Sequence, residues 1–538
     1  MSRFKTLMFF TVLLLISVIM LIAINQTEKK LDASIRKNNL YYTGQIRNAP
    51  PIVVFTTVAL GSFRGLLADV LWLRAASLQE EGNYFEMVQL ASWITKLQPR
   101  FSGATAYLAW NMAYNISVTC SLPEDRWRWI QEAIKLIRDE ALVYNPADPM
   151  LYKELGWIFQ HKMGNIMDDF NLYYKNRLAL EMEQVFGSKP DWQLLASAPR
   201  DTSELLKAIP NSGKFMELLG KSKYETLDKL FAEFKKQSKL PPDFVALIDS
   251  ARISDILDNY FRALWLLETY KLDPALINSI NNKYGALDWR TPEAQALYWA
   301  TKGLEMTLGH RDLSCERMIT QALKESFISG RILMIDKDKF ERIIMIPNLS
   351  VVDSVKRTFE EAYDKNEQQS TFLSAKLNFM QEAIILLYNY GKFAKAAEYY
   401  KMLQKEEPGK YRSTLENFVM EQWASEVRDA GSKKATDIIS GLIFRSCYFI
   451  AYGDDDAALA SERMARYIYN TYMMNNQDVQ TRTGLASYRD IKNTATDTCI
   501  KSLPPVMAEI LKARLQEDAA RKKDDEKEAK EKEAADKK

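Results

Sequence analysis

The sequence predicts an all-α protein in which a single N-terminal transmembrane helix precedes a degenerate array of helical repeats. Three observations predict this class. Glycine and proline are few for 538 residues, at 20 and 17, and strand-like alternation is scarce. An uncharged apolar segment lies near the N-terminus. Helical stripes separated by short turns then recur along the chain.

Composition indicates a folded body and argues against nucleic acid as a partner. Apolar residues make up 47% of the chain and charged residues 26%, which is close to ordinary globular usage. Lysine and arginine number 72 against 70 acidic residues, for a net charge of +2. A nucleic-acid-binding protein would normally carry a basic excess on one face.

The segment at 6–24 predicts a contact with the lipid bilayer. It has no charged residue and follows Arg3 and Lys5. A helix needs about 20 apolar residues to cross the hydrocarbon core. A cleaved signal peptide has a shorter apolar region and a small-x-small cleavage site, whereas here Leu21 stands two positions before Ala23. We therefore expect an uncleaved signal anchor.

Orientation follows from the layout of this anchor. A short basic N-terminus before a long apolar run favours an inner-membrane, single-pass protein with a periplasmic body. Counting lysine and arginine alone slightly favours the reverse, because four such residues follow the segment. These are Lys29, Lys30, Arg36 and Lys37.

The rest of the chain divides by composition and by the positions of its turns. The expected parts are the anchor at 1–24, a juxtamembrane linker at 25–50, a helical-repeat block at 51–186, an irregular helical insertion at 187–290, a helical pair and loop at 291–350, a second repeat block at 351–515 and a charged tail at 516–538. The apolar run at 52–63 is too short to span a membrane and predicts a buried helix. Thr291 and Pro292 predict a capped helix start, with Glu293 in the first turn.

No cluster of residues predicts catalysis, a metal or a cofactor, so we expect a protein that is not an enzyme. The two histidines, His161 and His310, are far apart, and we expect His161 to have a hydrogen-bonded structural role. The cysteines lack metal-ligand spacing and are expected to be free and buried, although one or two bridges remain possible. They are Cys120, Cys315, Cys447 and Cys499.

Two short sequences resemble ligand-binding loops but lack their spacing. Gly-Lys-Ser at 220–222 has Phe215 where a phosphate-binding loop needs glycine, so a helix end is expected. The three aspartates at 454–456 do not alternate as calcium ligands do, and they predict a helix N-cap.

Two segments share the same spacing of glycine, aromatic residue and proline. They are 81–99, with Gly82 and Pro99, and 390–408, with Gly391 and Pro408. The glycine releases the chain from one helix, and the proline ends the next. A helical pair of this kind cannot bury its apolar face alone, so we expect pairs to stack.

This pattern resembles the tetratricopeptide repeat family, whose unit of about 34 residues is a helix–turn–helix. The match is best at 377–410 and is also specific at 151–162, where Tyr152, Leu155, Gly156 and Phe159 follow the pattern of the family. The packing positions at 377–410 are Met380, Ala383, Ile384 and Leu387 in the first helix, and Ala396, Tyr400 and Leu403 in the second. A weaker match at 68–101 has Arg74 in an apolar position. Trp110, Ala113 and Tyr114 fit another first helix.

The resemblance implies an α-solenoid whose first helices line a concave binding groove. Carried over to this sequence, that face holds Asp69, Trp72, Asn111, Asn115, Asn378, Gln381, Tyr388 and Asn389. Asn111 and Asn115 share one helix face and could hydrogen-bond an extended peptide. Trp289 and Arg290 form a second candidate patch, because both residue types are common at interface hot spots.

The anchor and the repeats together resemble membrane-anchored repeat proteins of bacteria. That resemblance implies a scaffold or adaptor that binds protein or peptide partners in a membrane or envelope complex. Two alternatives remain open. One is a hydrolase of envelope polysaccharide, which would need two carboxyl groups about 5–10 Å apart in a deep pocket. The other is a periplasmic solute- or lipoprotein-binding module.

Overall fold

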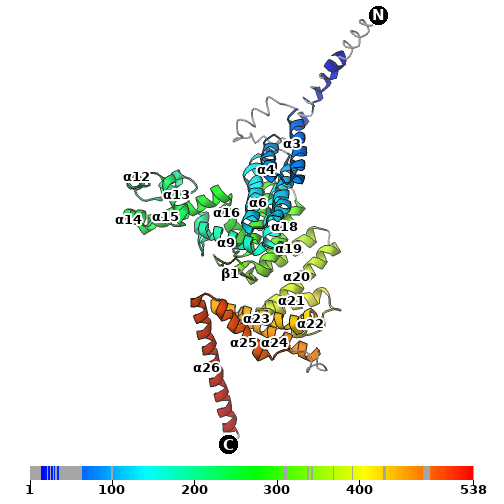
Figure 1. The fold of residues 1–538 in the computed structure, drawn as a ribbon, viewed down its shortest axis with the longest axis vertical. Coiled ribbons are helices and arrows are strands. Elements are labelled where there is room, and N and C mark those ends of the chain that lie inside the picture. Colours follow the sequence, from blue (N-terminus) through cyan, green and yellow to red (C-terminus); the bar gives the residue numbers. More distant parts are fainter. Residues whose placement is uncertain are drawn as a thin grey trace. The chain divides into compact units, whose positions relative to one another are not determined.

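The structure, a computed structural model, is helical except for one two-stranded sheet within the part of the chain that it describes, which confirms the all-α prediction (Figure 1). That part comprises residues 14–20, 22–24, 26–27, 29–30, 33–34, 63–97, 101–307, 312–335, 338–340, 343–366, 369–390, 392–427, 432–475 and 485–536. The chain divides into two compact units, Met1–Phe101 and Ser102–Lys538. The boundary falls inside the block predicted at 51–186.

Unit 1 contains α3 (Phe63–Glu80) and α4 (Tyr84–Leu97). Unit 2 begins with α5 (Ser102–Trp110), η1 (Asn111–Ile116), η2 (Ser117–Thr119), α6 (Pro123–Lys135), η3 (Leu136–Ala141), α7 (Leu142–Tyr144), α8 (Pro149–Trp157), η4 (Ile158–Gly164) and α9 (Asn171–Phe186). It continues with α10 (Trp192–Ala196), α11 (Thr202–Ala208), α12 (Ser212–Lys221), α13 (Leu227–Gln237), α14 (Pro242–Ile248), α15 (Ala251–Trp265), η5 (Leu266–Tyr270) and α16 (Pro274–Tyr284).

The second half of unit 2 holds α17 (Pro292–Met306), α18 (Leu313–Ser329), β1 (Arg331–Met334), β2 (Ile344–Ile346), η7 (Leu349–Val351), α19 (Val352–Lys365), α20 (Ser370–Asn389) and α21 (Phe393–Glu406). It ends with α22 (Leu415–Val427), α23 (Ser432–Tyr452), α24 (Asp455–Asn475), α25 (Tyr488–Ser502) and α26 (Pro505–Asp536). Of the η elements, η1, η3, η4 and η5 are π-helical, and η2 and η7 are 3-10 turns.

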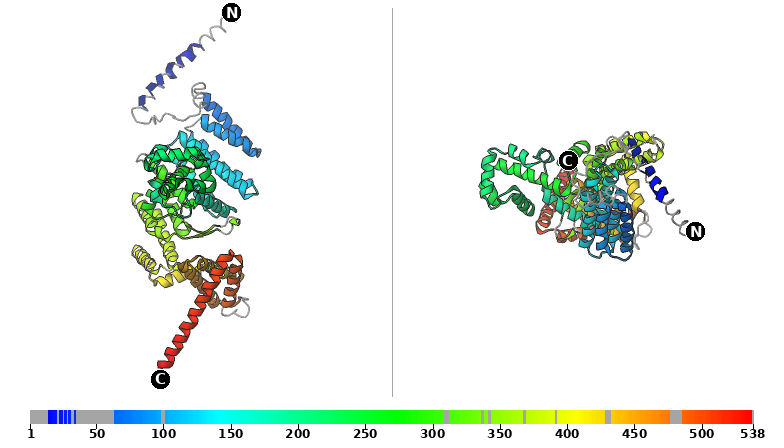
Figure 2. Two further views of the ribbon diagram at one scale, coloured as in Figure 1. Left: turned by 90° about the vertical axis from the view of Figure 1, so that its left-hand side faces the viewer. Right: turned by 90° about the horizontal axis from the view of Figure 1, so that it is seen from above.

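Unit 1 contains the helical pair expected around the Gly82 turn. Helices α3 and α4 pack against each other, with Ala75, Leu78 and Met87 buried, and Figure 2 draws the pair in blue. Gly82 has a φ of +75°, a left-handed conformation that glycine adopts without steric cost. Arg74, the departure from the repeat pattern, is exposed and pairs with Glu81 at 3.3 Å.

The predicted membrane anchor at 6–24 is described only in part, because residues 6–13 and 21 lie outside the described residues. Among the residues that are described, no helix combines the length and the apolar composition that a membrane crossing needs. The linker at 25–50 and the apolar run at 52–63 also lie largely outside the described part. The anchor therefore stays a prediction.

Helix α17 is deeply buried in the core of unit 2. Every residue from Pro292 to Ala300 is buried, and the helix packs against α8, η4 and α18. A helix that is buried all round needs neighbours on every side. The hydroxyl of Thr291 accepts a hydrogen bond from the backbone N–H of Ala294 at 3.4 Å, and Pro292 occupies the first turn, as the sequence predicts.

Two glycines set the spacing of α8, α17 and α18. A β-carbon at Gly303 of α17 would lie 2.8 Å from Cβ of Tyr152 and 3.1 Å from Sγ of Cys315. A β-carbon at Gly156 of α8 would overlap Sδ of Met318 and lie 3.2 Å from the backbone oxygen of Ala296 in α17. The three helices therefore approach one another more closely than larger residues at these positions would permit.

The insertion predicted at 187–290 consists of short helices. In Figure 1, α12, α13 and α14 lie with α15 in a green group of their own. Helix α15 packs against α10, α11, α13 and α14. Its buried Phe261 contacts the rings of Phe231 and Phe234, with ring centres 5.2 and 5.4 Å apart. These aromatic contacts give the insertion an apolar centre.

The sheet formed by β1 and β2 differs from the sequence-based expectation. The strands pair antiparallel, with Arg331 opposite Ile346, in a region expected to be part of a helical pair and loop. Isoleucine occurs once in β1 and twice in β2, and β-branched residues favour strands. The strands are four and three residues long, too short for an alternating pattern to be recognised.

The second repeat block contains further helical pairs. Helix α20 packs against α21, and α23 packs against α24, α25 and α26. The predicted packing positions at 377–410 are buried, namely Met380, Ala383, Ile384, Leu387, Ala396, Tyr400 and Leu403. Residues 516–536 of the predicted charged tail belong to α26, the long red helix in Figure 2.

The two loop-like sequences are helix ends, as predicted. Gly220 and Lys221 close α12. Asp454 accepts a hydrogen bond from the N–H of Ala457 at 3.1 Å at the start of α24. Among the described residues, no group of three or more His, Cys, Asp or Glu side chains could hold a metal ion. All four cysteines are free, and all but the half-buried Cys120 are buried.

Glu293 is a buried carboxyl group in the first turn of α17. It is 3% exposed, and its Oε2 has no hydrogen-bond partner among the residues that the structure describes. Burial raises the pKa of Glu293 to about 7, although the nearby charge of Lys175 opposes the change. The folded state therefore holds the proton of this carboxyl group to a higher pH than the unfolded chain does.

We expect Gly303→Ala to lower the free energy of unfolding by about 1–3 kcal/mol, because the added methyl group meets Tyr152 and Cys315. Gly441→Ala in α23 is the matched control, since nothing lies within 4 Å of its β-carbon position. Alanine should stabilise that helix by about 0.5–1 kcal/mol. Urea unfolding followed by circular dichroism measures both. Equal effects at the two sites would contradict the close packing.

Glu293→Gln should change how stability depends on pH. The folded pKa of about 7 exceeds the ordinary 4.5, so the folded state holds the proton more tightly. The stability contribution is complete below pH 4.5 and falls as pH rises toward 7, by about 3 kcal/mol in all. The variant should lack this loss, whereas Glu421→Gln, at an exposed carboxylate, should retain it. Unfolding measured from pH 5 to 8 tests this, and parallel curves for all three proteins would refute it.

Candidate binding pocket

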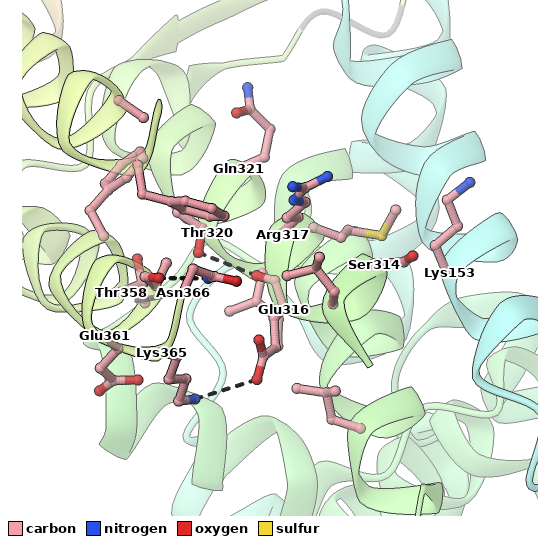
Figure 3. Close-up of a pocket in the computed structure, with 18 of the residues that line it drawn as sticks. Lys153, Ser314, Glu316, Arg317, Thr320, Gln321, Thr358, Glu361, Lys365 and Asn366 are labelled. Carbon is pink, nitrogen blue, oxygen red and sulfur yellow. Dashed lines mark hydrogen bonds and ion pairs between the residues drawn. The ribbon is translucent and has the colours of Figure 1, made fainter. Parts of the chain in front are cut away.

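A pocket of about 730 Å³, which we call the central pocket, opens between α8, α18, α19 and α20 (Figure 3). Volumes of roughly 300–1,000 Å³ are usual for ligand sites. Helix α8 and the adjoining η4 contribute Lys153, Trp157 and Gln160. The apolar lining includes Leu304, Leu313, Met318, Ile319, Phe359 and Phe372.

Positive charge outweighs negative charge around this pocket. The lining holds four cations, Lys153, Lys283, Arg317 and Lys365, and two acids, Glu316 and Glu361. Lys365 pairs with Glu316 at 3.4 Å, the contact dashed in Figure 3. Arg317 is exposed and forms no ion pair with the residues described, and its guanidinium lies 5.8 Å from the ring centre of Phe372. The pocket therefore offers an available guanidinium beside an apolar lining.

Gln160 is one of two buried polar residues of this lining, with Thr358. It is 8% exposed, and its Nε2 has no hydrogen-bond acceptor among the residues that the structure describes. A buried donor that lacks an acceptor costs about 1–3 kcal/mol. Because Gln160 belongs to the lining, its amide is a candidate donor to a carbonyl or carboxylate oxygen of a ligand.

An aromatic strip leads from α5 to the wall of the central pocket. Tyr107 and Trp110 stack with ring centres 6.4 Å apart, and Trp110 stacks on Tyr114 at 5.5 Å. Tyr114 contacts His161 at 5.6 Å, and His161 stacks on Trp157 at 4.6 Å. The strip is thus defined by Tyr107, Trp110, Tyr114, His161 and Trp157, and its last member lines the pocket.

His161 is held by this stacking rather than by the hydrogen bond we expected. Its Nδ1 is buried and has no partner among the described residues. Burial, with a smaller contribution from the charge of Lys162, lowers the pKa of His161. The imidazole therefore favours its neutral form, which suits a ring sandwiched between Trp157 and Tyr114.

A buried ion pair orients η4, the segment that carries Gln160 and the histidine. Lys162 Nζ lies 2.5 Å from Oδ2 of Asp168, and both side chains are more than nine-tenths buried. The hydroxyl of Tyr174 and the N–H of Phe170 donate to Oδ1 of the same aspartate. Burial alone would raise the pKa of Asp168, but these bonds and the lysine charge lower it. Removing one partner of such a pair typically costs about 3–5 kcal/mol.

The sequence-predicted groove residues of the first helices occupy different environments. Asp69 is exposed and Trp72 is half-buried on α3, in unit 1. Asn111 is fully buried, and the exposed Asn115 donates a hydrogen bond to its Oδ1 at 2.6 Å. Of this pair only Asn115 faces outward. Trp110, expected in a packing position, is 39% exposed.

Trp289 and Arg290 line a second pocket, of about 600 Å³, but neither is the exposed patch expected from the sequence. Trp289 is 2% exposed, and its Nε1 donates to Oδ1 of Asn281 at 3.0 Å. Arg290 pairs with Asp288 at 2.9 Å and with Glu183 at 3.2 Å. Both side chains make contacts inside the protein, so the expectation that they form a binding patch on the surface was wrong.

The four predicted residues of α20 lie beyond the central pocket. Asn378 is exposed, and Gln381, Tyr388 and Asn389 are half-buried. The ring of Tyr388 contacts Phe393, with centres 5.0 Å apart. Helix α20 lines the pocket instead through its first turns, with Thr371, Phe372 and Ala375.

Sequence reasoning missed the residues that form the central pocket. Gln160, Arg317 and Phe372 come from three different helices and belong to no motif. The only signal in the sequence was a cation beside apolar residues on an amphipathic helix. That pattern does not identify a site, because it is also common on ordinary solvent-exposed helix faces. No protein-family model, curated protein or solved structure matches this chain. Functional inference therefore rests on the chemistry of the pocket.

Proposed function

We propose that the protein is a membrane-anchored helical-repeat scaffold that binds peptide segments of partner proteins, with the central pocket as the binding site. The observation that carries this proposal is the combination found in one pocket of about 730 Å³. An apolar lining, the available Arg317 and the buried amide of Gln160 surround the same space.

These three features select the chemistry of the bound segment. The apolar lining takes a bulky aliphatic or aromatic side chain, since apolar burial supplies most binding free energy. Arg317 takes a carboxylate, because guanidinium and carboxylate match in geometry. Gln160 takes a backbone carbonyl oxygen. The preferred ligand is thus a peptide with an acidic residue next to a large apolar one.

The wider architecture supports a scaffold. Consecutive helices pack as pairs in α3–α4, α20–α21 and α23–α24, as tetratricopeptide-like repeats would. The uncharged segment at 6–24 supports the anchor, and the envelope location follows from it. Exposed aromatic residues of the strip, Tyr107 and Trp110, would extend the contact with a partner.

A solute-binding module is the second candidate, because the pocket volume also suits a small organic anion. A polysaccharide hydrolase has less support in this pocket. Of the two carboxylates in its lining, Glu316 pairs with Lys365 and Glu361 is exposed. That arrangement lacks the buried acid that a glycosidase requires.

Peptide display selected on the purified full-length protein should enrich segments with adjacent acidic and bulky apolar residues. Arg317→Glu should weaken binding of such a peptide about 10- to 100-fold, because a charge-assisted hydrogen bond is replaced by repulsion. Gln160→Leu should weaken binding less and leave its salt dependence unchanged. Arg317→Glu should reduce the salt dependence of binding or reverse its sign, because added salt then screens a repulsion. Isothermal titration calorimetry measures both.

Arg252→Glu is the charge-matched control, since Arg252 is exposed on α15 and does not line the pocket. It should bind as the unmodified protein does. If Arg317→Glu and Arg252→Glu lowered the peptide affinity equally, the effect would come from net charge alone. That result would contradict the proposed site. Enrichment of no peptide, together with tight binding of a small carboxylate, would favour the solute-binding module.

A further inference from the structure

Two cysteines far apart in the sequence meet in the C-terminal part of unit 2. Cys447 lies on α23 and Cys499 on α25, and these helices pack against each other. The residues are 3% and 0% exposed, and they belong to one apolar cluster. Both are free thiols. Buried thiols are often inert, so their immediate contacts decide whether they can react.

The two thiols contact each other directly. Cys499 stands three residues after Thr496, one helical turn along the helix that contacts Cys447, and each thiol perturbs the pKa of the other. Oγ1 of Thr496 lies 3.5 Å from the sulfur of Cys447. The interaction with Cys499 is the largest cause that lowers the pKa of Cys447 to about 7, and Thr496 contributes less. Burial of Cys447 opposes this change. The same contact raises the pKa of Cys499. The first proton of the pair is therefore easier to remove than the proton of an isolated buried thiol.

A small reagent can reach the first of these sulfurs. A pocket of about 540 Å³ is lined by Cys447, Thr496 and Lys492, and Cys499 does not line it. Lys492 also contributes to lowering the pKa of Cys447. The remaining cysteines, Cys315 and Cys120, do not share these properties. Burial raises the pKa of Cys315 to about 12, and neither Cys315 nor Cys120 lines this pocket.

We propose that Cys447 and Cys499 form a reversible dithiol–disulfide pair that covalently joins α23 to α25. The oxidant is a small disulfide, RSSR. The Cys447 thiolate attacks one sulfur of RSSR, a mixed disulfide forms and RS⁻ leaves. Cys499 then loses its proton and attacks the Cys447 sulfur, and a second RS⁻ leaves. Two protein thiols and RSSR become one protein disulfide and two RSH, so atoms and electrons balance.

The bond would stabilise the end of the chain. It would close a loop that contains α24, and closing a loop restricts the unfolded chain. Oxidation should therefore raise the melting temperature by several degrees. This inference is independent of the peptide-binding proposal, because none of these residues lines the central pocket.

The test uses detergent-solubilised full-length protein, equilibrated with cystamine and cysteamine in varied ratios. After acid quenching, denaturation and alkylation, peptide mass spectrometry reads each cysteine. We expect a Cys447–Cys499 cross-linked peptide that appears as the ratio rises, with Cys120 and Cys315 alkylated throughout. The melting temperature should rise with this cross-link, and the Cys447→Ser/Cys499→Ser double variant should show no such rise.

Single variants separate the two roles. Cys499→Ser should trap cysteamine on Cys447 as a mixed disulfide, whereas Cys447→Ser should leave Cys499 unmodified in the folded protein. Cys120→Ser should behave as the unmodified protein. Alkylation of all four cysteines at every ratio, or a bridge to Cys120 or Cys315, would overturn the proposal. Equal trapping in both single variants would overturn the assigned order of attack.

Discussion

The close approach of α8, α17 and α18 is the constraint on which unit 2 depends. Gly303 and Gly156 leave room for Tyr152, Cys315 and Met318 at contacts that a β-carbon would block. Because protein interiors are close-packed, a change of one methyl group there must be absorbed by the neighbouring helices. Helices α8 and α18 also form walls of the central pocket, and α17 contributes Leu304 to its lining. Packing of these three helices therefore helps to set the shape of that side of the pocket.

The buried polar groups of this region differ in how many hydrogen-bond partners they have. Asp168 receives bonds from Lys162, Tyr174 and a backbone N–H, which fixes the end of η4. Glu293 and Gln160 each leave one buried atom without a partner among the described residues. The carboxyl group of Glu293 can bind a proton instead, since its pKa is raised to about 7. Gln160 belongs to the lining of the central pocket, where a ligand is its candidate hydrogen-bond partner.

Local signals in the sequence predicted local structure well. The Gly82 turn and the Thr291 and Asp454 caps depend only on neighbouring residues, and each is present. The side chains of Trp110 and Asn111 could not be oriented in this way. They stand at the junction with the π-helical turn η1, whose wider winding shifts which residues face outward. Nor can sequence alone assemble a pocket from helices far apart in the chain.

Hydrogen–deuterium exchange of the full-length protein, with and without a saturating selected peptide, tests the central claim most directly. We expect slower exchange at 153–160, 313–321 and 358–366, three of the helical segments that line the central pocket. Protection should be absent from 443–450 beside the cysteine pair. Protection confined to other segments, with these three unchanged, would contradict the account and remove the central pocket as the peptide site.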